Sequence, residues 1–196
     1  MKQYSLLQTL YLVYCKIRTK LTFSNARIIR FPIDIRGKKF IKIGGNFTTG
    51  IGCRIEAYPE RDNKILFIGE NFQMNDYVHI TAMNSVVIGD NVLLASKIYI
   101  SDCTHGSYIG DENDSDPLLN PIDRPLSVKP VKIEDNVWLG EFVSVLPGVT
   151  IGKGTIVGAN SVVSKSLPSY VIAVGSPARP IKFYNFESKR WEKYVN

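Results

Sequence analysis

Of the two histidines in the chain, His105 stands where a reaction could be catalysed. It is followed by residues 106–130, a stretch rich in Asp, Asn, Ser and Pro. A loop of that length in a compact domain is usually functional or disordered, and its place directly after a histidine favours an arm beside an active site. Histidine titrates near neutrality, so it can remove the proton of a hydroxyl as that hydroxyl attacks. His105 is therefore the candidate general base.

Other reactive arrangements are not evident. Cys103 lies two residues before His105, but no Cys-His or Ser-His-Asp constellation accompanies it, so we interpret Cys103 as a packing residue. Two histidines cannot supply the three imidazoles of a zinc hydratase site, so no metal is expected. His79 is interpreted as a surface or interface residue and as a secondary candidate for the site.

The element that must position His105 is repetitive. A branched aliphatic residue recurs at every sixth position, for example at Ile133, Leu139, Val145, Ile151 and Val157. A helix cannot keep such a row on one face, whereas a coil of three short strands returns every sixth side chain to the same interior. The pattern predicts an all-β, hexapeptide-repeat parallel β-helix with coils of eighteen residues over residues 43–163.

The length of 196 residues fits one domain. We predict an N-terminal amphipathic helix within residues 1–24, a β-helix domain over residues 25–182 with the protruding loop 106–130, and a short helical tail over residues 183–196. Apolar residues on the outer faces of the coils, such as Leu93, would need a neighbour, which predicts an oligomer.

The cysteine count indicates the cellular compartment, and the distribution of charge limits the classes of binding partner. Three cysteines without a CxxC motif favour a reducing compartment, so we expect a cytoplasmic protein. The net charge of +6 is spread along the chain and no nucleic-acid motif accompanies it, so nucleic acid is not expected as a partner. No apolar stretch has the length of a membrane span.

Residues 4–21 have the period of an amphipathic helix. Its apolar positions are Leu6, Leu10, Val13, Ile17 and Leu21. Two interpretations remain open: the stripe packs on the first coils or on a partner subunit, or it lies on the surface of the inner membrane as a peripheral contact. The basic residues Lys16, Arg18 and Lys20 near its end fit either one.

Several motifs resemble a known family. Residues 88–95 (IGDNVLLA) followed by Thr104 and His105, residues 136–140 (NVWLG) and the closing segments 159–165 and 175–179 are similar to the hexapeptide-repeat acyltransferases of the maltose and galactoside acetyltransferase type. Further segments resemble bacterial O-antigen and exopolysaccharide O-acetyltransferases. These segments are residues 25–32, 54–58 and 184–191.

The resemblance implies a left-handed coil and a homotrimer with active sites between subunits, where one chain supplies the histidine and neighbouring coils the coenzyme slot. It implies acetyl transfer from acetyl-CoA to a hydroxyl of a saccharide or lipid-linked glycan in O-antigen, capsule or exopolysaccharide biosynthesis, with His105 as the base. The alternatives are acetylation of an amino sugar or small xenobiotic, which needs the same base and donor, and a non-catalytic scaffold, which needs neither His105 nor the arm.

The same resemblance assigns residues to the acceptor side. Asn75 would orient the acceptor hydroxyl or donate to developing negative charge, and the alternative is a turn asparagine in the left-handed conformation. Glu56 would bind the acceptor, orient His105 or face solvent. Met83 stands where the maltose-type enzymes have an aspartate, so their sugar specificity does not carry over. Trp138 would wall the slot or fill a subunit interface.

The coenzyme side is expected along the late coils. Small residues there would let an extended pantetheine arm lie against backbone, and basic residues would meet phosphates. The small residues are Gly140, Ala159 and Ser164, and the basic residues are Lys165, Arg179 and Lys182.

Overall fold

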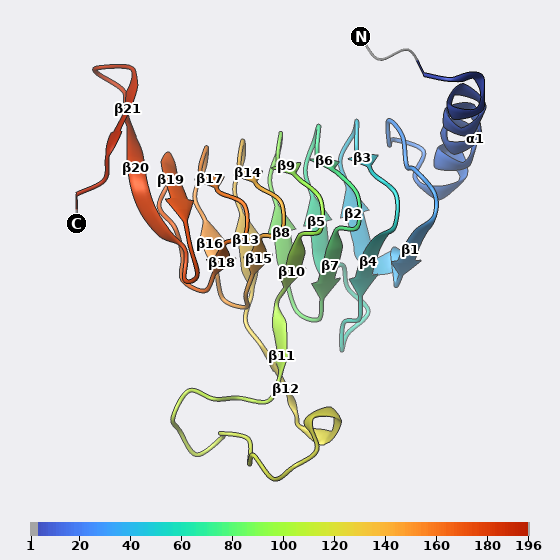
Figure 1. The fold of residues 1–196 in the computed structure, drawn as a ribbon. Helices are drawn as coiled ribbons and strands as arrows, with labels where there is room; N and C mark the ends of the chain where they lie inside the picture. Colours follow the sequence, from blue (N-terminus) through green and yellow to red (C-terminus); the bar gives the residue numbers. More distant parts are fainter. Residues whose placement is uncertain (1–3, 196) are drawn as a thin grey trace.

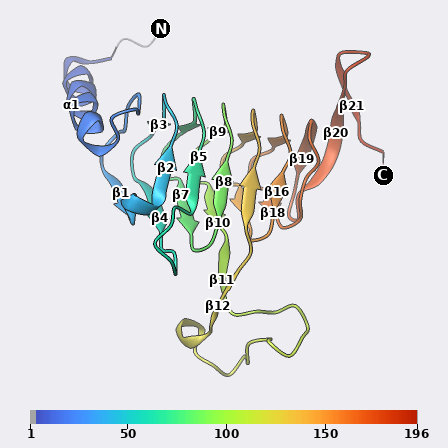
Figure 2. The same cartoon turned by 180° about the vertical axis from the view of Figure 1, so that it is seen from behind.

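The computed structural model describes residues 4–195. Stacked β-coils form a prism with the helix α1 (Leu6–Thr22) at one end and a C-terminal hairpin at the other, and an arm leaves the prism near its middle (Figures 1 and 2). In the described part of the chain, no helix is both long and apolar enough to cross a membrane.

Three parallel sheets form the sides of the prism. Sheet I contains β2 (Ile41–Ile43), β5 (Leu66–Ile68), β8 (Val86–Ile88), β13 (Val131–Ile133) and β16 (Thr150–Ile151). Sheet II contains β3 (Thr48–Thr49), β6 (Gln73–Met74), β9 (Leu93–Leu94), β14 (Trp138–Leu139), β17 (Ile156–Val157) and β19 (Val171–Val174). Sheet III contains β1 (Ile33–Arg36), β4 (Cys53–Ala57), β7 (His79–Ala82), β10 (Tyr99–Ser101), β15 (Ser144–Val145) and β18 (Val162–Val163).

The remaining elements are short. A 3-10 turn, η1 (Lys38–Phe40), precedes sheet I. The arm is built on the antiparallel pair β11 (Cys103–His105) and β12 (Leu126–Val128), with a second 3-10 turn, η2 (Pro121–Asp123), near its tip.

The hexapeptide register is confirmed. Its aliphatic positions face inward and are buried in every coil, as in the sets Ile68, Met74, Ile80 and Ile133, Leu139, Val145. The position four residues later is buried as well, for example at Phe72, Val78 and Val137, except where an extra segment leaves the coil, at Pro59, Asn84 and Thr104. Each coil therefore buries its apolar face against its neighbours, as expected for a solenoid.

Corner residues follow two separate rules. Asparagines such as Asn71 and Asn91 take the left-handed conformation with φ of 56°. Gly69 does not take that conformation, and it is needed because a Cβ there would lie 2.6 Å from the backbone of Gly89 in the next coil. The glycine after the aliphatic position thus permits close approach of two coils rather than a left-handed turn.

The C-terminal helix predicted for residues 183–196 is wrong. The tail instead forms an antiparallel hairpin of β20 (Arg179–Asn185) and β21 (Arg190–Lys193), which continues sheet II beyond β19. The backbone groups at the edge of β19 are thereby paired rather than left open, and Tyr184 packs edge-on against both Phe186 and Trp191. These long-range contacts outweigh the helical propensity of the segment.

The predicted N-terminal helix is present, and it begins with a capping box in which Ser5 and Gln8 exchange hydrogen bonds. Its predicted apolar stripe does not pack on the first coils. The buried face instead contains Cys15 and Thr19, and the Thr19 hydroxyl accepts a hydrogen bond of 2.8 Å from the Ile29 N–H. The stripe faces away from the prism.

Candidate active site

All insertions into the coils fall at one corner, the turn that leads from sheet III back to sheet I, which we call the insertion corner. Phe67, Gln73 and His79 on the three sheets are six positions apart, and this step is the same in the other coils. The coil lengths nevertheless differ, because Gln73 pairs with Leu93, Leu93 with Trp138 and Trp138 with Ile156. Only the last of these steps is the predicted eighteen.

Three extra segments therefore stack at this corner: loop 58–65, turn 83–85 and the arm 102–130. In solenoids, insertions that align on one face commonly build the binding surface. Here they enclose a cavity of about 370 Å³. Its lining residues are Pro59, Glu60, Arg61, Asn63, Ile65, Met83, Asn84, Leu126 and Val128.

The arm places His105 beside this cavity. It pairs with Leu126 across the β11–β12 ladder, and residues directly opposite in an antiparallel pair project on the same face. Because Leu126 lines the cavity, the His105 side chain lies on the cavity side of the arm. Met83 lines the cavity itself, whereas His105 is not one of its lining residues and lies beside it through its pairing with Leu126.

A buried carboxylate fixes the base of the arm, and our sequence analysis missed it. Asp102 is fully buried and accepts hydrogen bonds of 2.7 to 2.8 Å from the backbone N–H groups of Met83, Asn84 and Ser85. Hydrogen bonds to a charged carboxylate are stronger than hydrogen bonds between neutral groups. Asp102 thereby locks the arm to turn 83–85, which is one wall of the cavity, and only its position three residues before His105 could have signalled this role.

The imidazole of His105 is not engaged by other groups of the described chain. The side chain is exposed, and within residues 4–195 no group is hydrogen-bonded to its ring. Its backbone is held instead, because the Tyr108 hydroxyl donates to the His105 carbonyl at 2.6 Å and Arg124 donates to that hydroxyl at 2.9 Å. A fixed backbone with an unengaged ring suits a general base.

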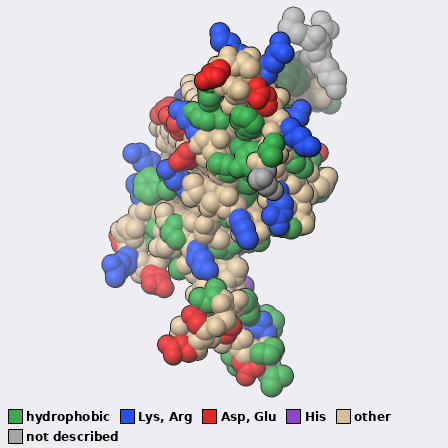
Figure 3. Space-filling view, turned by 90° about the vertical axis from the view of Figure 1, so that its left-hand side faces the viewer, with side chains coloured by type: hydrophobic (Ala, Val, Ile, Leu, Met, Phe, Trp, Pro, Cys, Tyr) green, Lys and Arg blue, Asp and Glu red, His purple; other side chains and the backbone are tan. Residues whose placement is uncertain are grey.

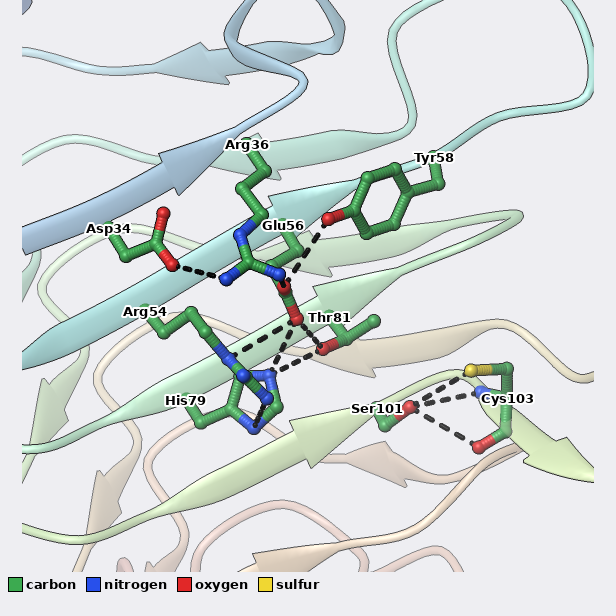
Figure 4. Close-up of polar contacts among 9 residues, drawn as sticks. All are labelled: Asp34, Arg36, Arg54, Glu56, Tyr58, His79, Thr81, Ser101 and Cys103. Atoms are coloured by element: carbon green, nitrogen blue, oxygen red, sulfur yellow. Dashed lines mark hydrogen bonds and ion pairs between the residues drawn. The ribbon is translucent and has the colours of Figure 1, made fainter. Parts of the chain in front are cut away.

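His79 has the opposite character, as Figure 4 shows. Its Nδ1 lies 3.3 Å from the Arg54 guanidinium, which can only donate, so the proton of the neutral ring is on Nε2. Nε2 lies 2.9 Å from a Glu56 oxygen and 2.7 Å from the Thr81 hydroxyl. Both ring nitrogens are used inside the protein, so His79 has none left for a substrate.

Glu56 is the centre of this outward-facing cluster on sheet III (Figure 4). Its side chain is 7% exposed and accepts from Arg36 at 2.9 Å and from Tyr58 at 3.3 Å, in addition to His79 and Thr81. Burial acts to raise the pKa of Glu56, but hydrogen bonds from His79 and Thr81 and the charge of Arg54 outweigh it, so the pKa is lowered.

The predictions for Glu56 need correction. It does not face solvent, and within one chain its hydrogen-bond partner is His79 rather than His105. Loop 58–65 follows Glu56 closely and shifts the register of the next coil, so the repeat period alone does not place His79 opposite the Glu56 strand. An acceptor-binding role for Glu56 stays a prediction.

A second hollow of about 230 Å³ lies against the arm, lined in part by Thr104, Lys129 and the predicted coenzyme residue Ser164. Thr104 precedes His105 and pairs with Ser127, which also lines this hollow, so the hollow is on the other face of the arm. Lys165, the residue after Ser164, is exposed.

The other predicted residues lie on the opposite edge of sheet III, at the turns from sheet II, which we call the small-residue edge. Asn75 donates its backbone N–H to Leu94 there, and Gly140 donates to Val157 two coils later. A Cβ at Gly140 would lie 2.7 Å from the backbone of Ala159, so these two stack closely. Trp138 is exposed on sheet II just before this edge.

Arg179 closes the small-residue edge where β20 begins, and Lys182 follows on the same strand, paired with Ile172. Both are exposed. Figure 3 views this C-terminal end and shows Lys and Arg side chains spread over it, whereas the arm below carries several acidic ones. Within one chain the base and the coenzyme edge are thus separated by the width of sheet III.

A coil of this kind with a histidine-bearing arm defines a class, the hexapeptide-repeat transferases. The profile of the family described as bacterial transferase hexapeptide (six repeats) matches residues 130–165. The chain is 45% identical over 192 residues to WbbJ of Escherichia coli K12, which is named "Putative lipopolysaccharide biosynthesis O-acetyl transferase". The match covers 98% of this chain and 96% of that relative. The chain belongs to the hexapeptide-repeat acetyltransferase family.

Solved structures agree with the fold. A galactoside acetyltransferase in complex with coenzyme A matches with a TM-score of 0.53 and 32% identity, covering 76% of this chain and 74% of that one. AntD, an N-acyltransferase from Bacillus cereus, matches with a TM-score of 0.70 and 22% identity over 88% of this chain and 90% of that one. The predicted left-handed β-helix is confirmed.

Proposed function

We propose that the protein transfers acetyl from acetyl-CoA to a hydroxyl of a saccharide destined for O-antigen, capsule or exopolysaccharide, with His105 as the general base. The observation that carries this proposal is the cavity at the insertion corner, which is bounded by polar groups such as Asn63 and Asn84 and by Leu126, the residue that pairs with His105 across the arm. Polar groups that converge in a cleft are what a sugar hydroxyl requires.

In the proposed reaction His105 takes the proton of the acceptor hydroxyl as its oxygen attacks the thioester carbonyl carbon. The carbon–sulfur bond then breaks, and the imidazolium returns the proton to the departing thiolate of CoA. The products are an O-acetyl ester and free CoA, and His105 is again neutral. The Asn75 amide would donate to the oxyanion that forms between these two steps.

Two copies would have to share each site. His105 and Met83 lie at the insertion corner, whereas Asn75, Gly140, Ala159 and Arg179 follow the small-residue edge. A cyclic homotrimer in which the arm of one chain reaches the small-residue edge of the next would join the base to the coenzyme slot. Galactoside acetyltransferase has been solved in complex with coenzyme A, which supports an acyl-CoA donor.

Two measurements test this function, the release of CoA thiol and the acetyl content of the surface glycan. Purified protein should release CoA thiol from acetyl-CoA only when a saccharide acceptor is present. Surface glycan from cells that lack the gene should lose one acetyl ester per repeat, as measured by mass spectrometry before and after mild alkali. Unchanged glycan masses together with no acceptor-dependent thiol release would refute the proposal.

The coenzyme contacts give a separate prediction. Replacing Arg179 and Lys182 together by glutamate should weaken CoA by roughly tenfold and dephospho-CoA by much less, because a reversed charge acts mainly on the phosphate it faces. Titration calorimetry would measure both affinities. Lys189→Glu with Arg190→Glu, at the turn of the same hairpin, has the same change in net charge and should leave both affinities unaltered. Equal losses for the two ligands would show that neither residue reads the extra phosphate.

A further inference from the structure

The helix α1 turns its most apolar face away from the rest of the protein. Leu6, Leu7, Ile17 and Leu21 are 76%, 78%, 63% and 82% exposed, and Leu10 and Val13 are more than half exposed. At 100° per residue these side chains form one continuous arc, opposite the arc of Cys15 and Thr19 that rests on residues 26–31. Such an apolar face needs a partner.

The position of α1 makes this face accessible. The helix lies at the extreme N-terminal end of the prism, beyond the first coil and far from the C-terminal hairpin (Figures 1 and 2). It is held there rigidly, because the Tyr11 hydroxyl donates to the Phe31 carbonyl at 2.6 Å and the guanidinium of Arg18 stacks 4.1 Å from the Phe31 ring. The outer face is therefore presented by a fixed element.

The charges beside this face are of one sign. Lys16 and Lys20 flank the apolar arc on one side and Arg18 on the other, and all three are exposed. No acidic residue occurs in the sequence before Asp34. Among the residues 4–195, none of these three basic groups forms a salt bridge, since their polar contacts are to carbonyl and tyrosine oxygens.

We propose that α1 docks through this face on a membrane surface rich in anionic lipid, with its axis in the plane of the interface. An apolar arc flanked by Lys and Arg is the pattern of helices that lie at the boundary of headgroups and acyl chains. The charge also argues against a second copy of α1 as the occupant, because two such faces would bring only like charges together. This inference does not depend on the proposed function, although it would place the enzyme beside lipid-linked acceptors.

Vesicle binding by the full-length protein tests the proposal. Flotation with phosphatidylcholine vesicles containing about a quarter phosphatidylglycerol should recover the protein at low salt. Recovery should fall at least several-fold at about 0.5 M salt or with phosphatidylcholine alone, since the Debye length shortens to a few ångströms and the anionic charge is absent, respectively. Recovery that is equal on the two kinds of vesicle would overturn the proposal.

Point variants separate the helix face from the rest of the surface. Leu10→Ser with Ile17→Ser should reduce flotation at least tenfold and leave the melting temperature and the turnover of a soluble acceptor unchanged, because both side chains already face solvent. The matched control is Leu118→Ser with Ile122→Ser on the arm, which makes the same two changes at apolar side chains that are even more exposed and should float like the unaltered protein.

Light scattering tests whether the apolar face of α1 is instead covered by a second copy of this chain. The Leu10→Ser and Ile17→Ser variant should keep the oligomeric mass of the unaltered protein. A smaller mass would identify the face as a contact between copies of this chain and would overturn the membrane assignment, as would normal flotation of this variant. The outcome is independent of whether the protein acetylates a saccharide.

Discussion

Replacing His105 by alanine should lower kcat for acetyl transfer by roughly two to four orders of magnitude, because the acceptor hydroxyl then has no group to take its proton. The ring of His105 makes no hydrogen bond within the described chain, so its removal should leave the fold, the oligomeric mass and CoA affinity unaltered. The rate of thiol release at saturating acetyl-CoA measures the effect.

The matched control is the other histidine. His79→Ala removes a ring whose two nitrogens both serve the Glu56 cluster, so its expected effect is on stability, with the rate per folded enzyme reduced far less. Near-normal turnover by a correctly folded His105→Ala protein would contradict the assignment of the base. A larger loss of turnover in His79→Ala than in His105→Ala would assign the chemistry to the Glu56 cluster on the face of sheet III.

The coils could be predicted because their period is a local property of the sequence. Every sixth residue enters the same interior wherever the chain follows the solenoid, so residues such as Ile80 and Val145 were identified without knowledge of any tertiary contact. The coil lengths could not be predicted in this way. The insertions at residues 58–65 and 83–85 are short, and nothing in the period shows that they stack with the arm at one corner.

Side-chain contacts between neighbouring coils were harder to predict than the coils themselves. Glu56 meets His79 only because Arg54 pairs with His79 across β4 and β7, a register set by the length of loop 58–65. Asp102 has a similar origin, since its three amide partners belong to the preceding coil. For α1, the period identified an apolar stripe, but the choice of the face that meets the body depended on hydrogen bonds of Thr19 and Tyr11 with distant backbone.

Replacing Glu56 by glutamine should lower the melting temperature by about 4 to 8 °C, which corresponds to about 2 kcal/mol for a chain of this length. The amide would leave the Arg36 and Arg54 guanidiniums without their buried anion, and one of its two ends can no longer accept from His79 or Thr81. The estimate is below that for a fully buried pair, because the two arginines are 49% and 44% exposed and water replaces part of the lost interaction.

The pH dependence of stability identifies the charge as the cause. Because the pKa of Glu56 is lower in the folded than in the unfolded chain, its contribution is complete above the unfolded value and is lost as the pH falls through the lowered folded value. Melting curves of the unaltered and Glu56→Gln proteins should therefore differ most near neutrality and converge in acid. Glu134→Gln is the control, since Glu134 also has a lowered pKa but pairs with Lys132 in solvent, and its effect should be small throughout. Parallel melting curves for the unaltered and Glu56→Gln proteins over the whole acid range would mean that packing, rather than the carboxylate charge, holds this cluster together.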